Sequence, residues 1–411
     1  MTFLFTYIMN KSLRQAYIVI EKMFLLSKIN VTVLVVAVFS WIQLTHGRCT
    51  RVCFFYASAA SPIIFRPRMI DSAISSRCSH LIIGYGYVID ARNPRIQVHD
   101  KVTEFMPGFQ ALRKADANFK ILLQIQNWDY NDMRPETYDD VISTASGRRI
   151  LIQNIVKLLQ TMGFDGILIR NSNYGRLVSI KREHILFLQE LATEFRSQSS
   201  TTGRPKLLLF ESLLEPYNTP LIEACSDVNG ICREVDMVIL ETHYLYQSNL
   251  TPTHHSRLYN EAPNQKYSVN FVTNYALSKG CAKEKLLIAI TADALTFQKS
   301  HFLKYQFYNF YGLLPYWVLC SRLKKYSPKV QRYSDQAPFV YYEIWRNDWQ
   351  RVEESFYNFY EDAVSLKAKV NYIKQKGLGG FVLWEFYSDD NSNDCLDGRY
   401  PILSILNREC T

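Results

Sequence analysis

The sequence lacks the residue spacings that hold metal ions. Its nine cysteines contain no Cys-x-x-Cys pair, and its one histidine doublet, His254-His255, stands alone in a polar segment where solvation is the more ordinary role. We therefore expect neither a metal ion nor another cofactor.

A basic stripe is also missing. The formal net charge is +9, yet Lys and Arg are scattered along the chain and no basic cluster is interleaved with aromatic residues. Nucleic-acid-binding surfaces concentrate positive charge on one face, so we expect no nucleic-acid partner. Internal repeats and low-complexity tracts are absent too, which argues against a repeat array.

The N-terminal segment lacks a run long enough for a membrane span. Its apolar stretch, Val31–Leu44, is shorter than the about 20 residues that cross a bilayer. Lys28 precedes this stretch, and Thr45-His46-Gly47 follows it with a small residue for cleavage, as in signal peptides. We expect residues 1–47 to be a signal peptide, with a signal anchor as the alternative. The rest of the chain is then extracellular.

Cysteine, in contrast, is plentiful. Nine cysteines fit an oxidising compartment, and their odd number leaves one thiol unpaired or bonded between chains. Asn249-Leu250-Thr251 is a glycosylation sequon in a polar segment. Both observations agree with secretion.

Eight apolar segments alternate with segments of helical spacing. This alternation predicts an α/β fold, a closed (β/α)8 TIM barrel that spans residues 48–411. From about residue 297 to 359 the chain is crowded with Tyr, Phe and Trp and shows no clean period, which we interpret as an insertion after the seventh strand. The predicted strands are 51–57, 78–87, 120–126, a segment that begins at Phe164, 206–214, 235–242, 285–292 and 379–386.

The fourth strand carries the most informative residues. The turn residues Gly163 and Asp165-Gly166 introduce it, and Ile167-Leu168-Ile169 is aliphatic throughout, as expected when both faces are covered. A polar run, Arg170 to Asn173, follows it.

This segment resembles the fourth-strand signature of glycoside hydrolase family 18, the chitinases and chitinase-like proteins. That signature reads Phe-Asp-Gly-hydrophobic-Asp-hydrophobic-Asp-Trp-Glu, and Phe164-Asp165-Gly166 match it. Leu168, Arg170 and Ser172 stand where the family has its two inner aspartates and its catalytic glutamate. The segment therefore resembles an active site without its acids.

Further motifs resemble the same family in collinear order. The inserted segment and the C-terminal tail resemble those of insect imaginal disc growth factors, non-catalytic members whose inserted segment is α+β. The matching stretches are Val52-Cys53-Phe54-Phe55, Cys78-Ser79-His80-Leu81, Lys120 to Trp128, Leu313-Leu314-Pro315-Tyr316, Lys374 to Trp384 with Asp389-Asp390, and Tyr400-Pro401-Ile402-Leu403.

The resemblance implies two disulfide bonds, Cys53–Cys78 and Cys320–Cys395. The pairing of the other cysteines stays open. Cys225 and Cys232 are placed to close a small loop, and Cys49 and Cys410 are candidates because chain ends meet in a closed barrel.

The resemblance also implies how the chemistry is lost. In the family a glutamate protonates the glycosidic oxygen, and a neighbouring aspartate orients the substrate's N-acetyl group, whose carbonyl attacks the anomeric carbon. Ser172 is too weak an acid, and Arg170 is a donor only. Leu168 replaces the third acid. The family's strand-six motif reads Met-x-Tyr-Asp, and Glu241-Thr242-His243-Tyr244 aligns with it, so His243 stands where the family has a tyrosine. Loss of one general acid costs about 10²–10⁴-fold, so we expect no enzyme.

Other acids lie near the ends of strands five to eight, the face where barrel sites form. An unpaired arginine inside a barrel is very costly, so we favour an ion pair of Arg170 with Glu211 or Glu241 over a rebuilt active site that includes Asp293 and Glu385. Serine hydrolase chemistry is a further alternative, but the sequence has no nucleophile-elbow motif.

The aromatic residues of the family's cleft are better preserved than its acids. Trp384 matches the tryptophan under the reacting sugar, and Tyr85, Phe54 and Trp128 match other cleft positions. Pyranose faces stack on such rings, although core packing is an equal alternative for Phe54.

These observations predict a secreted, catalytically inactive chitinase-like protein. It binds chitin oligomers or other glycans, with a lectin-like or growth-factor-like role and a cell-surface receptor as a further candidate partner. The alternatives are a glycosidase with relocated acids and a structural extracellular protein whose cleft is occluded by Arg170 and its partners.

Overall fold

The computed structural model describes residues 49–56, 70–126, 136–170, 174–202, 206–213, 218–245, 251–262, 265–300, 307–346 and 351–410. The expected signal segment 1–47, Trp128, Ser172 and Asn249 lie outside these residues. Within them, every helix is too short or too polar to cross a membrane.

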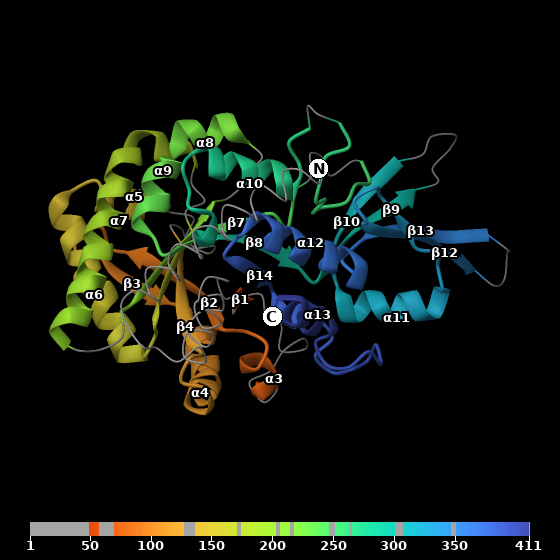
Figure 1. Ribbon diagram of the computed structural model, residues 1–411, viewed down its shortest axis with the longest axis horizontal. Helices are drawn as coiled ribbons and strands as arrows, with labels where there is room; N and C mark the ends of the chain where they lie inside the picture. The colour runs from red at the N-terminus through yellow and green to blue at the C-terminus, as the bar shows by residue number, and fades with distance from the viewer. Residues whose placement is uncertain are drawn as a thin grey trace, which may run out of the picture. The chain divides into compact units, whose positions relative to one another are not determined.

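Eight parallel strands form the centre of the molecule (Figure 1). They pair in chain order, and β1 pairs with both β2 and β14, so the sheet closes on itself. The predicted (β/α)8 barrel is therefore confirmed. Its strands are β1 (Thr50–Tyr56), β2 (His80–Ile89), β4 (Lys120–Gln126), β5 (Gly166–Arg170), β6 (Leu208–Leu213), β7 (Met237–Leu240), β8 (Leu286–Thr291) and β14 (Gly380–Trp384).

One further strand joins this sheet without entering the barrel. β3 (Arg95–Val98) pairs antiparallel with the end of β2. Its residues alternate between exposed and half-buried, so it carries no apolar run from which it could be predicted.

Helices surround the strands and bury their apolar faces against them in one large core. α6 shows the pattern: Thr144 caps its N-terminus, Gly163 ends it with φ 74°, and Leu151, Ile155 and Leu159 are buried. The helices are α3 (Ser72–Ser75), α4 (Asp100–Ala115), α5 (Glu136–Ile142), α6 (Ala145–Met162), α7 (Tyr174–Thr202), α8 (Thr219–Cys225), α9 (Val228–Glu234), α10 (Val269–Ser278), α12 (Ala363–Lys376) and α13 (Pro401–Cys410), with 3-10 turns η2 (Lys283–Lys285) and η3 (Phe386–Ser388).

Alternate residues of each strand point into the barrel and form a second, smaller core. Gly166 allows β5 and β6 to approach closely, because a Cβ there would lie 2.1 Å from the carbonyl oxygen of Leu208. The inner core consists of Val52, Phe54, Ile82, Leu122, Leu168, Phe210, Ile239, Leu287, Ala289, Val382 and Trp384.

Between β8 and β14 the chain forms a separate antiparallel sheet. Its strands run in the order β10-β9-β13-β12-β11, and α11 (Tyr316–Tyr326) packs on one face through an apolar cluster that includes Val340, Tyr342 and Phe356. Figure 1 shows this sheet and its helix together. The strands are β9 (Asp293–Ser300), β10 (Phe307–Pro315), β11 (Gln331–Arg332), β12 (Pro338–Arg346) and β13 (Arg351–Phe359).

Four disulfide bonds hold the chain. Cys53–Cys78 and Cys320–Cys395 are confirmed, and Cys49–Cys410 joins the two ends of the barrel with a Cα–Cα distance of 5.7 Å.

The suggested pairing of Cys225 with Cys232 is wrong. Cys232 bonds Cys281, because the end of α10 lies against α9, where the side-chain amide of Asn229 donates to the carbonyl oxygen of Lys279 at 2.8 Å. Cys225 is buried outside the four disulfides.

Candidate functional site

The two described acid positions of the fourth barrel strand, Leu168 and Arg170, lie inside the barrel. Leu168 is completely buried in the inner core, and Arg170 follows two residues later on the same side of β5. Two of the three positions therefore hold a hydrocarbon and a cation. The third, Ser172, is outside the described residues.

Arg170 forms a bidentate ion pair with Glu241. Arg170 Nε donates to Glu241 Oε1 at 2.8 Å and Nη2 donates to Oε2 at 3.0 Å, while the Ser212 hydroxyl donates to Oε1 at 2.9 Å. Burial raises the pKa of Glu241, but the charge and hydrogen bonds of Arg170 outweigh burial and hold that pKa below its usual value. Glu241 is thus an ionised partner and not a proton donor.

Glu211, the other partner considered for Arg170, points out of the barrel. Its neighbour Phe210 lies in the inner core, and Glu211 Oε1 lies 2.8 Å from His184 Nε2 on α7. Tyr138 on α5 continues this series of hydrogen bonds, with its hydroxyl 3.3 Å from His184 Nδ1. Burial opposes a charge on His184, yet the Glu211 carboxylate raises the pKa of His184 overall. Glu211 therefore belongs to the layer between strands and helices.

Trp384 lies on the barrel floor with both ring faces covered. The Phe54 ring stacks on it with a centroid distance of 3.9 Å and the His243 ring at 4.7 Å, and the guanidinium carbon of Arg170 is 5.4 Å from its centroid. Two rings stacked on the same indole face would contact each other, and no Phe54–His243 ring contact occurs among the described residues, so they cover opposite faces. Only 5% of Trp384 is exposed.

The three described aromatics of the expected stacking set are covered by other side chains. Phe54 is 0% and Tyr85 2% exposed, so they join Trp384 in the core. The His243 imidazole contributes to this burial, because it stacks on the indole of Trp384. We retain core packing as the role of Phe54.

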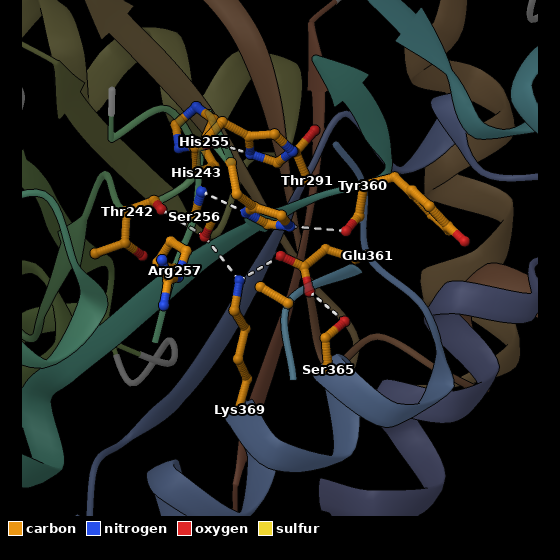
Figure 2. Close-up of polar contacts among 12 residues, drawn as sticks. Thr242, His243, His255, Ser256, Arg257, Thr291, Tyr360, Glu361, Ser365 and Lys369 are labelled. Carbon is orange, nitrogen blue, oxygen red and sulfur yellow. Dashed lines mark hydrogen bonds and ion pairs between the residues drawn. The ribbon is translucent and has the colours of Figure 1, made fainter. Parts of the chain in front are cut away.

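Hydrogen bonds from His255 and Ser256 hold the backbone on either side of His243, as Figure 2 shows. The His255 Nδ1–H donates to the His243 carbonyl oxygen at 2.7 Å, and the Ser256 hydroxyl donates to the Thr242 carbonyl oxygen at 2.7 Å. Lys369 Nζ donates to Ser256 Oγ at 2.7 Å and pairs with Glu361. Helix α12 thereby fixes the position of His243 on Trp384.

His243 is neutral in this position. Burial lowers its pKa to about 4, with Glu241 acting in the opposite direction. Its Nδ1 atom is buried and has no hydrogen-bond partner among the described residues. A neutral imidazole with so low a pKa is no general acid near neutral pH.

A pair of carboxyl groups, the buried Asp293 and the half-buried Glu385, follows β8 and β14. Burial raises the pKa of Asp293, and burial together with the Asp293 charge raises the pKa of Glu385 to about 7. The Tyr387 hydroxyl donates to Glu385 Oε2 at 3.0 Å, and the Tyr244 hydroxyl donates to Asp293 Oδ2 at 3.2 Å. Glu385 also has a left-handed backbone, φ 57°. The sequence placed both acids near strand ends, but the effect of the Asp293 charge on the pKa of Glu385 was not predicted.

Glu385→Gln is expected to leave the free energy of unfolding unchanged below pH 4.5 and to raise it by on the order of 3 kcal/mol above pH 7. As pH rises, the unfolded chain ionises near pH 4.5, whereas the folded chain keeps the proton to about pH 7. Stability of the parent therefore falls through this window, and the neutral amide does not titrate. Urea unfolding across the window measures the difference.

Tyr387→Phe serves as the companion variant. The Tyr387 hydrogen bond lowers the pKa of Glu385, so its removal should shift the upper end of the window to higher pH, while the lower end, set by the unfolded chain, stays in place. A parent-to-Glu385→Gln difference that is constant with pH would contradict a raised pKa.

Three potential metal ligands converge at one described position, Cys320, Asp390 and Cys395. Cys320 and Cys395 share a disulfide bond, so neither offers a thiolate. Asp390 accepts backbone N–H bonds from Asp394 and Cys395 at 3.0 and 2.7 Å. This grouping holds a loop and is not a metal centre.

The barrel, its substituted acid positions and the inserted sheet define a glycoside hydrolase fold with an altered floor. Residues 50–389 match the family described as glycosyl hydrolases family 18. The chain belongs to this family.

Several relatives are similar over most of the chain. Oviduct-specific glycoprotein of Mesocricetus auratus is 25% identical over 87% of this chain and 53% of its own length, and Chitotriosidase-1 of Mus musculus is 25% identical over 84% and 74%. The chain thus spans about half the length of the first and three quarters of the second. Chitinase-3-like protein 2 of Homo sapiens is 23% identical over 87% of this chain and 91% of its own length.

Solved structures share the fold. Human YKL-39, described as a pseudo-chitinase with retained chitooligosaccharide binding properties, superposes with a TM-score of 0.72 at 21% identity, covering 88% of this chain and 99% of that one. The catalytic domain 2 of Ostrinia furnacalis Group II chitinase has the same TM-score at 20% identity, covering 88% and 96%. At these sequence identities the structural similarity shows a shared fold.

Proposed function

We propose that the chain is a secreted, non-hydrolytic chitinase-like protein that recognises glycans outside the cell. The observation that carries this proposal is the Arg170–Glu241 pair, which puts a fixed cation at an acid position of the fourth barrel strand. Cleavage of a glycosidic bond needs a group that gives a proton to the leaving oxygen. Arg170 and Leu168 have no such proton to give, and the Ser172 hydroxyl is too weak an acid.

An extracellular role is supported by covalent chemistry. Four disulfide bonds suit an oxidising compartment. Within residues 1–47 a basic residue, an apolar run and a small residue follow one another, as in a signal peptide. The Asn249 sequon fits the same route. A receptor would be a further partner in a growth-factor-like role.

Recognition of glycans is supported by the similarity to related proteins and not by the barrel floor. YKL-39 is described as keeping chitooligosaccharide binding as a pseudo-chitinase. In this chain Phe54 and His243 cover Trp384, so a glycan that enters the barrel mouth cannot stack on that indole unless His243 moves.

The full chain incubated with chitohexaose is expected to release no shorter oligomers. Product analysis by mass spectrometry, with a working chitinase as positive control, measures this. Turnover above the buffer blank would contradict the proposal, because no group at the described family acid positions can protonate the leaving oxygen.

A glycosidase with relocated acids is the second candidate. It is favoured by one observation: Glu385, adjacent to Trp384 in the chain, has a pKa of about 7 and would carry a proton near neutrality. If this candidate holds, turnover appears and Glu385→Gln abolishes it, whereas Ser172→Ala leaves it unchanged.

A further inference from the structure

The inserted sheet has two faces, and only one is covered by a helix. Val340 and Tyr342 of β12 pack in the cluster beneath α11. Residues alternate along a strand, so Tyr341, Glu343 and Trp345 lie on the opposite face. The irregularity near Trp345 keeps this alternation, because β13 carries the extra residue between Glu354 and Val352.

Strand register places further residues on the same face. Tyr357 is directly opposite Tyr341, and Ser355 is opposite both Glu343 and Lys299 of β9. Cross-strand partners share a face, so these side chains form one surface. We call Lys299, Tyr341, Glu343, Trp345 and Tyr357 the aromatic face.

The aromatic face is open where the rest of the same side is buried. Towards the start of β9 the rings of Phe297 and Phe359 are 0% and 2% exposed. Further along the sheet Tyr341 and Tyr357 are half-buried and Trp345 is 55% exposed, whereas Ser355 between Glu343 and Lys299 is 0% exposed. Large aromatic side chains gathered on a surface mark binding sites.

The part of the aromatic face around Tyr341 is held by contacts within the sheet. The rings of Tyr341 and Tyr357 are 4.8 Å apart, and Lys299 Nζ lies 5.9 Å from the Tyr341 ring. The Tyr341 hydroxyl donates to Glu343 Oε1 at 2.5 Å. A surface held in this way loses little freedom when a ligand binds.

The chemistry of the aromatic face fits a sugar better than a protein. The centres of protein interfaces are depleted in Lys and Glu, yet Lys299 and Glu343 lie among these rings. A pyranose presents C–H groups to a ring and hydroxyl groups to charged neighbours, so it can satisfy both kinds of residue. From Tyr341 to Trp345 the strand spans about 13 Å, room for a short oligosaccharide.

We propose that the aromatic face binds a neutral oligosaccharide of N-acetylglucosamine type. This inference deepens the proposed function and takes from it the class of ligand. It shares no residue with the barrel floor, so it gives the chain a means of holding a glycan while Trp384 stays covered.

Isothermal titration calorimetry of the full chain with chitohexaose tests the site. Trp345→Ala and Tyr341→Ala are each expected to weaken binding at least tenfold, as loss of a central aromatic contact does. Tyr311→Ala is the matched control: Tyr311 is 53% exposed on the same sheet, but its ring contacts Phe356 on the face beneath α11. It should bind like the parent.

The outcomes separate this site from the proposed function. If the parent binds and the Trp345→Ala and Tyr341→Ala variants bind equally well, the aromatic face is the wrong surface and glycan recognition stands. If the parent does not bind, both fall. If Trp345→Ala instead converts a dimer to a monomer while sugar binding is unchanged, the face joins two copies of the chain and the inference is overturned. Circular dichroism verifies that each variant is folded.

Discussion

Lys369→Met is expected to lower the free energy of unfolding by about 3–5 kcal/mol. The side chains of Lys369 and Glu361 are 2% and 0% exposed and form an ion pair, and Lys369 also donates to Ser256 (Figure 2). Without the ammonium group the Glu361 carboxylate stays buried, and the Ser365 hydroxyl is its remaining donor among the described residues. Urea unfolding followed by circular dichroism measures the loss.

Two further variants control this result. Glu361→Leu combined with Lys369→Met removes both charges and is expected to be more stable than Lys369→Met alone, since no unpaired charge is left. Lys101→Met breaks a pair with Glu104 whose side chains are 36% and 44% exposed, and should cost at most about 1 kcal/mol. A cost of that size for Lys369→Met would show that the buried pair is not what holds this region.

The barrel was predictable because its strands are covered on both faces. Each of the eight then reads as an apolar run, and β5, with Ile167 to Ile169, is the clearest case. β3 has no such run, because it is an edge strand with one half-buried and one exposed side. The Cys232–Cys281 bond depends on the packing of α9 against the end of α10, which no local pattern records.

The partner of Arg170 could have been predicted more sharply from the sequence. In β6 the alternation that puts Phe210 and Ser212 inside the barrel puts Glu211 outside, which leaves Glu241 as the partner. The covering of Trp384 could not have been predicted from the sequence. It depends on the orientation of His243, which is set by contacts with His255 and, through Ser256, with a helix more than a hundred residues away.

Restoring the three family acids, with Leu168→Asp, Arg170→Asp and Ser172→Glu together, is expected to destabilise the chain by about 3 kcal/mol and to give no measurable chitinase activity. Arg170→Asp removes the cation that Glu241 binds through two hydrogen bonds and puts a second carboxylate beside it. Leu168→Asp puts a further carboxylate into the inner core. Carboxylates that share one buried site cannot all ionise, so protons are taken up or the floor rearranges. Urea unfolding and a chitohexaose assay measure the two effects.

The matched control adds Glu241→Met and His243→Tyr, the residues of the family's strand-six motif, to the three acids. Glu241→Met removes the buried carboxylate that would face Arg170→Asp, so part of the loss of about 3 kcal/mol should be recovered. His243→Tyr removes the imidazole from the indole of Trp384. If the three acids alone gave full turnover, the Arg170–Glu241 pair and the imidazole would not be what keeps this barrel from cutting a sugar. If turnover appears only with all five changes, loss of catalysis rests on the whole floor, from β5 to the loop after β7, and not on the missing acids alone.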